Sequence, residues 1–474
     1  MNPLLTKSVA EIRDAFASGD TTPLDVLDAT LEHIEVTNPV INAIAYVDES
    51  GARAAAQAAT DRLRAGQSLG GLDGIPVTIK DSVHAIGMPW RHGVAANADL
   101  KMSTTDAPPA ARLKEAGAVI IGKTTMPDMG MMAAGVSSLY GITRNPWDLS
   151  RNTGGSSSGA GASLASGIGF GSVGSDIAGS VRLPAGHCGL VALKPTQGRI
   201  PHVAPSTMRS AGPMARSVDD LIDLYRVISW PDPRDTWSLP YEDTADIHAP
   251  LSPAGLKIGV MLDMGYGHSV SEPVAAVVRN AAAQLSAAGA VVTEMPPVFT
   301  YDPYPALDRL FQVRARTEWE AIPEARRFEV LPAVAEWAYG AASYSAADFS
   351  RDTDSVMRSQ EFVRARTSEF DFVISPVIPT VGFGAEEVGL DPLQPLAHCS
   401  FTAWFNQTAQ PASALCFGFS TPFGTNAGMP IGIQVVGPRF ADQAVLRLTK
   451  WLETQRQIAM DWPVDVAADK IGAA

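Results

Sequence analysis

The sequence predicts an α/β protein built around a mixed β-sheet. Short apolar runs typical of buried strands alternate with helical patterns between residues 70 and 200. Further strands and helices follow from residue 256 onward, and 474 residues could form one large α/β domain or two to three smaller ones. Residues 151–195 combine many serines and glycines with small apolar residues that can pack, which a flexible linker would lack.

Composition excludes several classes of protein. The 474 residues carry a formal net charge of −14, which argues against nucleic acid or an anionic membrane as a partner. No apolar run approaches the roughly 20 residues that span a bilayer. The N-terminus lacks a basic segment followed by a long apolar one, so no signal peptide is expected. The three cysteines form no disulfide framework, and we expect a cytoplasmic protein.

The first part of the chain, residues 1–66, is predicted to be helical. Ser8 and Glu11 form a capping box for a helix over about 9–17. Thr22 then caps a second helix that has Pro23 at its first position. A third, alanine-rich helix is expected over about 49–65, ending at Gly66.

Within residues 67–230, three apolar strands are predicted to end in a lysine. The strands are expected over 75–79, 118–122 and 190–193, and the lysines are Lys80, Lys123 and Lys194. The alternative interpretation of each of these lysines is an ion-paired or snorkelling side chain with no catalytic role.

The second half contributes further elements of the same kinds. A helix is expected to begin at Ser217, and residues 300–360 show a helical pattern that could cover the site. The remaining predictions are strands over about 256–260, 370–379 and 431–436, a strand near 291, and helices over about 274–288 and 442–454.

The stretch 151–195 is interpreted as the floor of an active site, with a packed glycine-rich turn as the alternative. Asp176 is its only carboxylate, and consecutive N–H groups in glycine-rich turns can bind an anion. The G-x-S-x-G pattern at 155–159 lacks the strand that a nucleophile elbow needs. The G-x-G-x-x-G pattern at 169–174 lacks the acidic residue expected about twenty positions on, so no cofactor is expected.

A hydroxyl nucleophile in this floor needs a base. The only histidine inside it is His187, and an esterase that uses His187 as its base remains one hypothesis. A buried lysine is the other candidate, because Ser–Lys variants of the catalytic triad exist. Its pKa would have to fall from about 10.4 to near 7.5, which burial at the end of an apolar strand could achieve.

Several motifs together resemble the amidase signature family. GGSSSG (154–159), GSDIAGSVRLPA (174–185) and ALKPTQGRIP (192–201) are similar to its signature, and GIPVTIKD (74–81) is similar to its lysine motif. Similar segments occur from RNPW (144–147) to GMPIGIQVVG (428–437), so the resemblance covers nearly the whole chain. The resemblance implies a single large α/β domain over residues 1–474, with a central mixed β-sheet flanked by helices and with residues 67–230 as its catalytic core. Ser158, Ser175 and Ala178 depart from the family pattern.

The resemblance implies a Ser–cisSer–Lys triad. By position, Ser180 is the nucleophile, Ser156 the bridging serine that follows a cis peptide bond, and Lys80 the base. The backbone N–H groups of four residues would form the oxyanion hole, and three further side chains would support the network. The oxyanion-hole residues are Ile177, Ala178, Gly179 and Ser180; the supporting residues are Ser157, Asp176 and Arg182.

The reaction implied is hydrolysis of an amide C–N bond through an acyl-enzyme, with carbamates or esters as alternative substrates. Met129, Met131 and Met132 fall where the family's acyl pocket forms, and they favour an apolar or aryl substrate; core packing is the alternative for a methionine cluster. An amidotransferase A-type subunit is a less favoured alternative, and a non-catalytic binding subunit is another. We expect a small-molecule amide or carbamate as partner, no metal, and a homodimer as one option for the oligomeric state.

Overall fold

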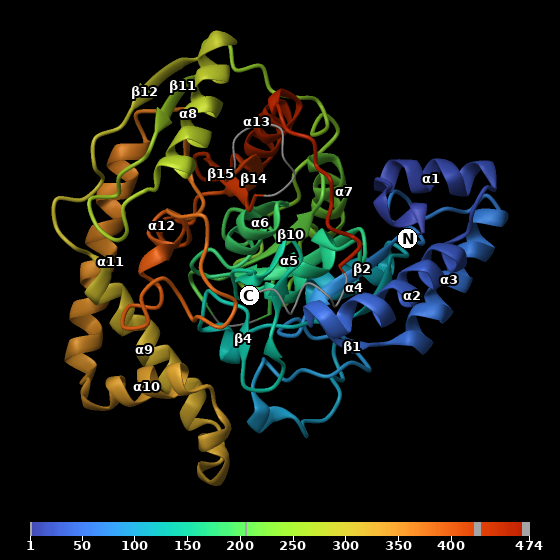
Figure 1. The fold of residues 1–474 in the computed structure, drawn as a ribbon, viewed down its shortest axis with the longest axis horizontal. Helices are drawn as coiled ribbons and strands as arrows, with labels where there is room; N and C mark the ends of the chain where they lie inside the picture. Colours follow the sequence, from blue (N-terminus) through green and yellow to red (C-terminus); the bar gives the residue numbers. More distant parts are fainter. Residues whose placement is uncertain (1, 204–205, 421–427, 467–474) are drawn as a thin grey trace.

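Among the described residues, 2–203, 206–420 and 428–466, a sheet of 11 strands forms the centre of this computed structural model (Figure 1). Parallel and antiparallel neighbours both occur, which confirms the prediction of one α/β domain with a mixed sheet. In spatial order the strands are β1 (Ile44–Val47), β3 (Val119–Thr124), β2 (Pro76–Lys80), β8 (Gly171–Asp176), β10 (Ser210–Ala215), β9 (Val191–Lys194), β14 (Ala412–Phe419), β15 (Pro430–Val436), β13 (Phe372–Pro376), β11 (Lys257–Val260) and β12 (Val291–Glu294).

Helices cover both faces of the sheet. The apolar cores containing α5, α6 and α9–α12 lie on one face, and the core containing α4, α7, α8 and α13 lies on the other. The helices are α1 (Val9–Ser18), α2 (Pro23–Ile41), α3 (Glu49–Arg64), α4 (Pro108–Glu115), α5 (Ser158–Ala165), α6 (Arg182–Cys188), α7 (Val218–Ile228), α8 (Glu272–Ala287), α9 (Tyr304–Glu320), α10 (Pro332–Gly340), α11 (Ala346–Thr367), α12 (Ala403–Gln407) and α13 (Asp442–Gln455). Two short hairpins join β4 (Val136–Ser137) to β5 (Gly141–Ile142) and β6 (Arg144–Asn145) to β7 (Asp148–Asn152).

The N-terminal part is not wholly helical, which corrects the prediction for residues 1–66. The capping box of Ser8 and Glu11 is present, and Thr22 caps α2 with the help of Asp25. Between α2 and α3, however, β1 joins the edge of the main sheet by pairing with β3. A four-residue edge strand that pairs with residues far along the chain leaves little periodic signal in the sequence.

Residues 300–360 are mainly helical and form one flank of the molecule. Figure 1 shows α9, α10 and α11, in gold to orange, on the side opposite the blue helices α1–α3. Tyr304, Leu307 and Phe311 of α9 lie in the same apolar core as Ala178. This flank therefore reaches the loop that follows β8.

The ends of β2 and β8 bring the predicted site residues together. These strands are parallel neighbours, with Ile79 beside Val173, so their carboxyl ends meet at one edge of the sheet. The predicted lysine-ended strands correspond to β2, β3 and β9, and each includes its lysine. Lys80 ends β2, and the loop after β8 carries Ser180 into α6.

Candidate active site

Lys80 is held at the end of a fully buried strand and points at a serine. Every residue of β2 is buried, and Lys80 is 1% exposed. Its Nζ lies 2.8 Å from Ser156 Oγ. It also lies 3.3 Å from the hydroxyl and 3.4 Å from the carbonyl oxygen of Ser175. The ammonium or amine is therefore surrounded by hydroxyl and carbonyl oxygens, and the nearest is that of Ser156.

The surroundings of Lys80 favour its neutral form. Burial is the main cause that lowers its pKa to about 7, because a charged amine loses its hydration there. The positive charge of Arg209 lowers the pKa further, whereas the carboxylates of Asp176 and Asp81 raise it. Near neutral pH a large fraction of Lys80 is therefore able to accept a proton.

The loop before α5 places Ser156 against its neighbours through contacts that only glycine permits. A Cβ on Gly155 would lie 2.5 Å from both the nitrogen and the oxygen of Ala134. The peptide bond between Gly155 and Ser156 is cis. Asn152 fixes the start of the loop, because its Oδ1 accepts hydrogen bonds from the N–H groups of Gly154 and Gly135. The Ser156 side chain that results is buried.

Ser180 lies in the turn between β8 and α6, beside the Ser156 loop. The N–H of Ser157 donates to the carbonyl oxygen of Ser180 at 3.1 Å, which ties the two loops together. Ser180 is 9% exposed, compared with 3% for Ser156 and 1% for Lys80, so it is the outermost of the three. Within the described residues its hydroxyl makes no hydrogen bond.

Asp176 and Arg182 form a fully buried ion pair beneath this turn. Two guanidinium nitrogens of Arg182 donate to the Asp176 carboxylate at 2.9 and 3.0 Å. Burial alone would raise the pKa of Asp176, but Arg182 outweighs it and keeps that pKa well below the usual range. Arg182 also donates to three oxygens contributed by other parts of the chain, those of Thr402, Asn406 and Gln434. The pair therefore locks the turn in place.

Three of the four predicted oxyanion-hole donors are unengaged. The N–H of Gly179 donates to Asp176 Oδ1 at 2.7 Å, so this predicted donor is already used. In the part of the chain that the structure describes, the N–H groups of Ile177, Ala178 and Ser180 donate no hydrogen bond.

The departure from the family pattern at Ala178 is compatible with this turn. The left-handed backbone falls on Gly179, with a φ of 128°, and not on Ala178. A Cβ on Gly179 would lie 2.4 Å from Thr402 Oγ1. Glycine is therefore required at 179, whereas alanine is accommodated at 178.

The remaining predicted residues lie around this centre. Ser157 is buried directly before α5, and its Oγ has no hydrogen-bond partner among the described residues. Met129, Met131 and Met132 are buried in the same apolar core as Ala178. A Cβ on Gly130 would lie 3.2 Å from Ser156 Oγ, so the methionine segment borders the serine.

His187 does not approach either serine hydroxyl within a hydrogen bond among the described residues. Its ring packs edge-on against Phe383, with the centroids 5.6 Å apart, and burial lowers its pKa to about 4. The geometry therefore gives no support to the esterase hypothesis with His187 as base.

Sequence reasoning missed several residues that shape the site. Asn406 Nδ2 donates to the carbonyl oxygen and the carboxylate of Asp176, and Gln434 accepts from Arg182. A signal was present, because the Asn-Gln-Thr centre of the apolar segment 401–419 places polar groups in a buried environment, where they need partners.

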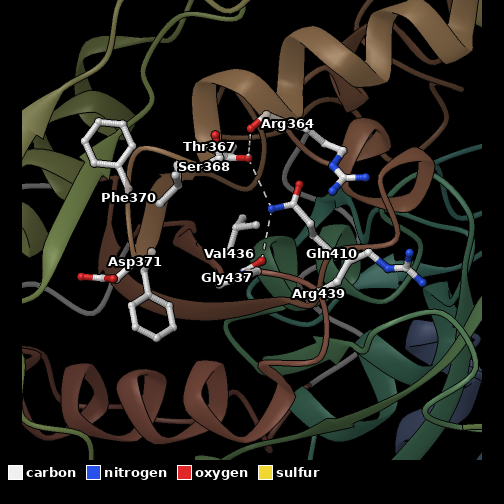
Figure 2. A pocket seen from close by; sticks show the side chains of 12 residues that line it. Arg364, Thr367, Ser368, Phe370, Asp371, Gln410, Val436, Gly437 and Arg439 are labelled. Atoms are coloured by element: carbon white, nitrogen blue, oxygen red, sulfur yellow. Dashed lines mark hydrogen bonds between the residues drawn. The ribbon is translucent and has the colours of Figure 1, made fainter.

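An open groove elsewhere contains none of the predicted site residues (Figure 2). It is lined by the end of α11, the start of β13 and the segment after β15, and it includes Arg364, Gln410 and Arg439. Gln410 Nε2 donates there to Thr367 and to the carbonyl oxygen of Gly437. The residues that line this groove do not pair a nucleophile with a base.

The comparison with known proteins shows the family. A family model described as Amidase matches residues 25–446, and the chain belongs to the amidase family. An acylamidase from Rhodococcus erythropolis is 30% identical, with 97% of each chain covered. The A-type subunit of the glutamyl-tRNA(Gln) amidotransferase of Chloroflexus aurantiacus is 32% identical over 96% of this chain and 99% of its own.

Solved structures agree with this assignment. A bacterial aryl acylamidase of the amidase signature family superposes with a TM-score of 0.88 at 25% identity, covering 97% of this chain and 98% of its own. The A-type subunit of the glutamyl-tRNA(Gln) amidotransferase of Thermotoga maritima has a TM-score of 0.77 at 26% identity, with 96% of both chains covered. The chain is thus an amidase signature hydrolase that acts on amide carbon–nitrogen bonds.

Two further features are absent from the described residues. None of the helices in those ranges has the length and apolar character required to cross a bilayer. No group of three or more histidine, cysteine, aspartate or glutamate side chains in the same ranges is arranged to hold a metal ion.

Proposed function

We propose that the chain hydrolyses amides through an acyl-enzyme on Ser180, with Ser156 as the proton relay and Lys80 as the base. The observation that carries this proposal is the 2.8 Å contact between Lys80 Nζ and Ser156 Oγ, at a lysine whose pKa is lowered to about 7. A lysine that is partly neutral near pH 7 can act as a general base, which an ordinary lysine cannot.

The first half of the reaction forms the acyl-enzyme. Lys80 Nζ accepts the proton of Ser156 Oγ, and Ser156 Oγ accepts that of Ser180 Oγ. Ser180 Oγ then attacks the carbonyl carbon of the amide. In this proposal the N–H groups of Ile177, Ala178 and Ser180 stabilise the oxyanion, and loss of one such donor typically costs about 10²–10³ in rate. No hydrogen bond joins the hydroxyls of Ser156 and Ser180 among the described residues, and catalytic hydrogen bonds of this kind tighten when substrate binds.

The second half releases both products. The proton held by Lys80 returns through Ser156 to the departing nitrogen, and the amine leaves. Water then donates a proton along the same route and attacks the ester carbonyl, which restores Ser180 and frees the acid. Asp176, Arg182 and Ser157 take no part in proton transfer and hold the two loops.

The substrate we favour has an apolar or aryl group. Met129, Met131 and Met132 provide soft apolar surface in the core that borders Ser156, and the structural neighbour with a TM-score of 0.88 is an aryl acylamidase. Carbamates and esters present the same kind of carbonyl and remain alternative substrates. A cytoplasmic location and a homodimer stay predictions.

A second candidate function is that of an amidotransferase A-type subunit. It is favoured by the relatives that are 31–33% identical and carry that name. The superpositions favour the acylamidase instead, with a TM-score of 0.88 compared with 0.77. An A-type subunit would show glutamine hydrolysis that depends on partner subunits, whereas an acylamidase acts alone.

The test combines labelling with turnover. The purified chain should be labelled by an alkyl fluorophosphonate, and peptide mapping should place the adduct on Ser180. The same preparation should release 4-nitroaniline from 4-nitroacetanilide without added protein. An adduct on Ser157, or turnover of glutamine alone and only with partner subunits, would contradict the proposal.

A further inference from the structure

An arginine at the rim of this site, Arg209, interacts with its charged neighbours in the described residues only at longer range. Arg209 immediately precedes β10, and its guanidinium donates no hydrogen bond and forms no salt bridge there. Its Nε is buried without an acceptor, while the side chain as a whole remains partly exposed. Leaving the buried Nε–H donor of an arginine unpaired is costly.

The backbone places Arg209 next to the loop of Ser180. Ser210 pairs with Asp176 across antiparallel strands, so residue 209 lies beside the start of the loop that carries the unengaged N–H groups. Asn406 Nδ2 holds the two segments together, since it donates to the carbonyl oxygens of both Met208 and Asp176. Arg209 is also the charge that most lowers the pKa of Lys80, which places it within electrostatic reach of that amine.

A second cation faces the same place from the helical flank. Arg314 of α9 acts electrostatically on Arg209, and its own Nε is buried without an acceptor among the described residues. Arg314 pairs with Glu318 at 3.3 Å, and Glu318 in turn contacts His92 Nδ1 at 3.4 Å. Burial lowers the pKa of His92 well below its ordinary value, so that ring is neutral. Glu318 is therefore paired with Arg314, and its charge acts on Arg209 without a salt bridge among the described residues.

The cluster also borders the predicted acyl pocket. The carbonyl oxygen of His92 accepts a hydrogen bond from the N–H of Met129 at 2.8 Å, and the next residue, Gly130, lies against Ser156. A group bound between Arg209 and Arg314 would thus lie near the scissile bond. A single planar anion supplies the charge that the cluster lacks, and a carboxylate matches the fork of an arginine.

We propose that Arg209, assisted by Arg314, binds a carboxylate of the substrate, so that the preferred substrates are amides that carry a carboxylate near the scissile carbonyl. This inference rests on the proposed function of Ser180. The carboxylate would bind at a charged side of the site, next to the apolar surface of the methionine segment. Arg209 would then be a specificity-determining residue.

The test compares two isosteric substrates, glutaryl 4-nitroanilide and the neutral 5-oxohexanoyl 4-nitroanilide. It is run at pH 9, where Lys80 is mostly neutral in wild type. Arg209→Gln should lower kcat/KM for the glutaryl compound about 10- to 100-fold relative to the neutral one, chiefly through KM. Arg439→Gln, in the groove of Figure 2, is the matched control and should leave the ratio unchanged. An unchanged ratio in Arg209→Gln, or an equal loss for both substrates, would overturn the inference.

A measurement on the wild-type protein covers the case in which the variant does not fold. At constant ionic strength, glutarate should slow fluorophosphonate labelling of Ser180, whereas heptane-2,6-dione, its neutral isostere, should not. Labelling that neither compound slows would overturn the carboxylate site while leaving the nucleophile intact. Absence of labelling at Ser180 in any buffer would instead contradict the proposed function itself.

Discussion

Lys80 is the last residue of β2 and Lys123 the last but one of the neighbouring parallel strand β3; both lysines are buried, yet their amines have different partners. The Nζ of Lys80 lies against the hydroxyl of Ser156, whereas that of Lys123 donates to the carbonyl oxygen of Val83. The register explains the difference, because Lys123 pairs with Ile79 and Lys80 with Thr124. Adjacent positions along a strand point to opposite faces, so the two amines emerge on opposite sides of the sheet.

The comparison shows that a lowered pKa does not identify the base. Burial lowers the pKa of Lys80 to about 7, that of Lys123 to about 8 and that of Lys194, at the end of β9, to about 7. Lys194 Nζ contacts only the carbonyl oxygen of Pro195 among the described residues. What distinguishes Lys80 is a hydroxyl that can give up a proton, and this depends on the face of the sheet and on the loop before α5.

The largest expected effect is the loss of activity in Lys80→Met. Removal of the base should lower kcat for 4-nitroacetanilide by about 10³-fold or more, because general-base catalysis and the relay through Ser156 are both lost. Lys123→Met is the matched control, since it removes an equally buried amine on the opposite face, and it should keep kcat within about tenfold. Steady-state kinetics of the two folded variants measure the contrast. Similar losses in both would mean that the two lysines act only through folding.

A smaller effect is expected from Ser175→Ala. Ser175 Oγ lies 3.3 Å from Lys80 Nζ and helps to orient it. Loss of this hydrogen bond should lower kcat/KM about 2- to 10-fold, in keeping with a bond worth about 0.5–1.5 kcal/mol. The variant should leave Ser180 reactive toward fluorophosphonate. A loss as large as that of Lys80→Met would assign Ser175, and not Ser156, to the relay.

The next prediction concerns the pH profile. Arg209 lowers the pKa of Lys80 but is not among the causes that lower the pKa of Lys123. Its removal should therefore change the titration of Lys80 and not that of Lys123. In Arg209→Gln, the ascending limb of kcat/KM for a neutral amide should move to higher pH. At pH 7 the rate should fall a few-fold, and near pH 9 it should recover. If the midpoint of the ascending limb stayed at its wild-type pH, the limb would not reflect the titration of Lys80.

The last effect is on stability and leaves the rate of catalysis unchanged. The unfolded chain holds the proton of Lys123 up to about pH 10.4, whereas the folded chain releases it near pH 8. Unfolding therefore takes up a proton between these values, and this lysine makes the free energy of unfolding rise with pH by up to about 1.4 kcal/mol per pH unit. Lys123→Met should lack that contribution, so its stability relative to wild type should fall between pH 8 and 10. Denaturant titrations at several pH values test this, and parallel curves would contradict it.

Much of the site was predictable because it is built from local sequence. The lysine that ends β2 follows an apolar run, and the glycines around Ser156 and Ser180 mark positions where a Cβ would clash with a neighbouring segment. The sequence predicted that all four N–H groups of residues 177–180 are free to bind the oxyanion. The engagement of Gly179 by Asp176 depends on the actual path of the turn, which composition does not specify.

Other parts depend on contacts between distant segments. β10 lies in the middle of the sheet but contains Gly212 and Pro213, which normally argue against a central strand. Pro213 is accommodated opposite Val173 because β8 and β9 supply the rest of the pairing. Arg209 lies outside every motif, and only the register of β10 brings it to the site. The helical pattern of residues 300–360 was predicted, whereas the packing of α9 in the same apolar core as Ala178 depends on contacts between distant segments.

The central claim is that Lys80 activates Ser180 by accepting a proton through Ser156. The pH dependence of Ser180 labelling tests this claim most directly. The second-order rate of fluorophosphonate labelling, mapped to Ser180, should rise with pH about a midpoint near 7 in wild type. Lys123→Met should show the same midpoint, whereas Lys80→Met should label at least about 10²-fold more slowly and show no limb near 7. An unchanged rate and midpoint in Lys80→Met would contradict the account.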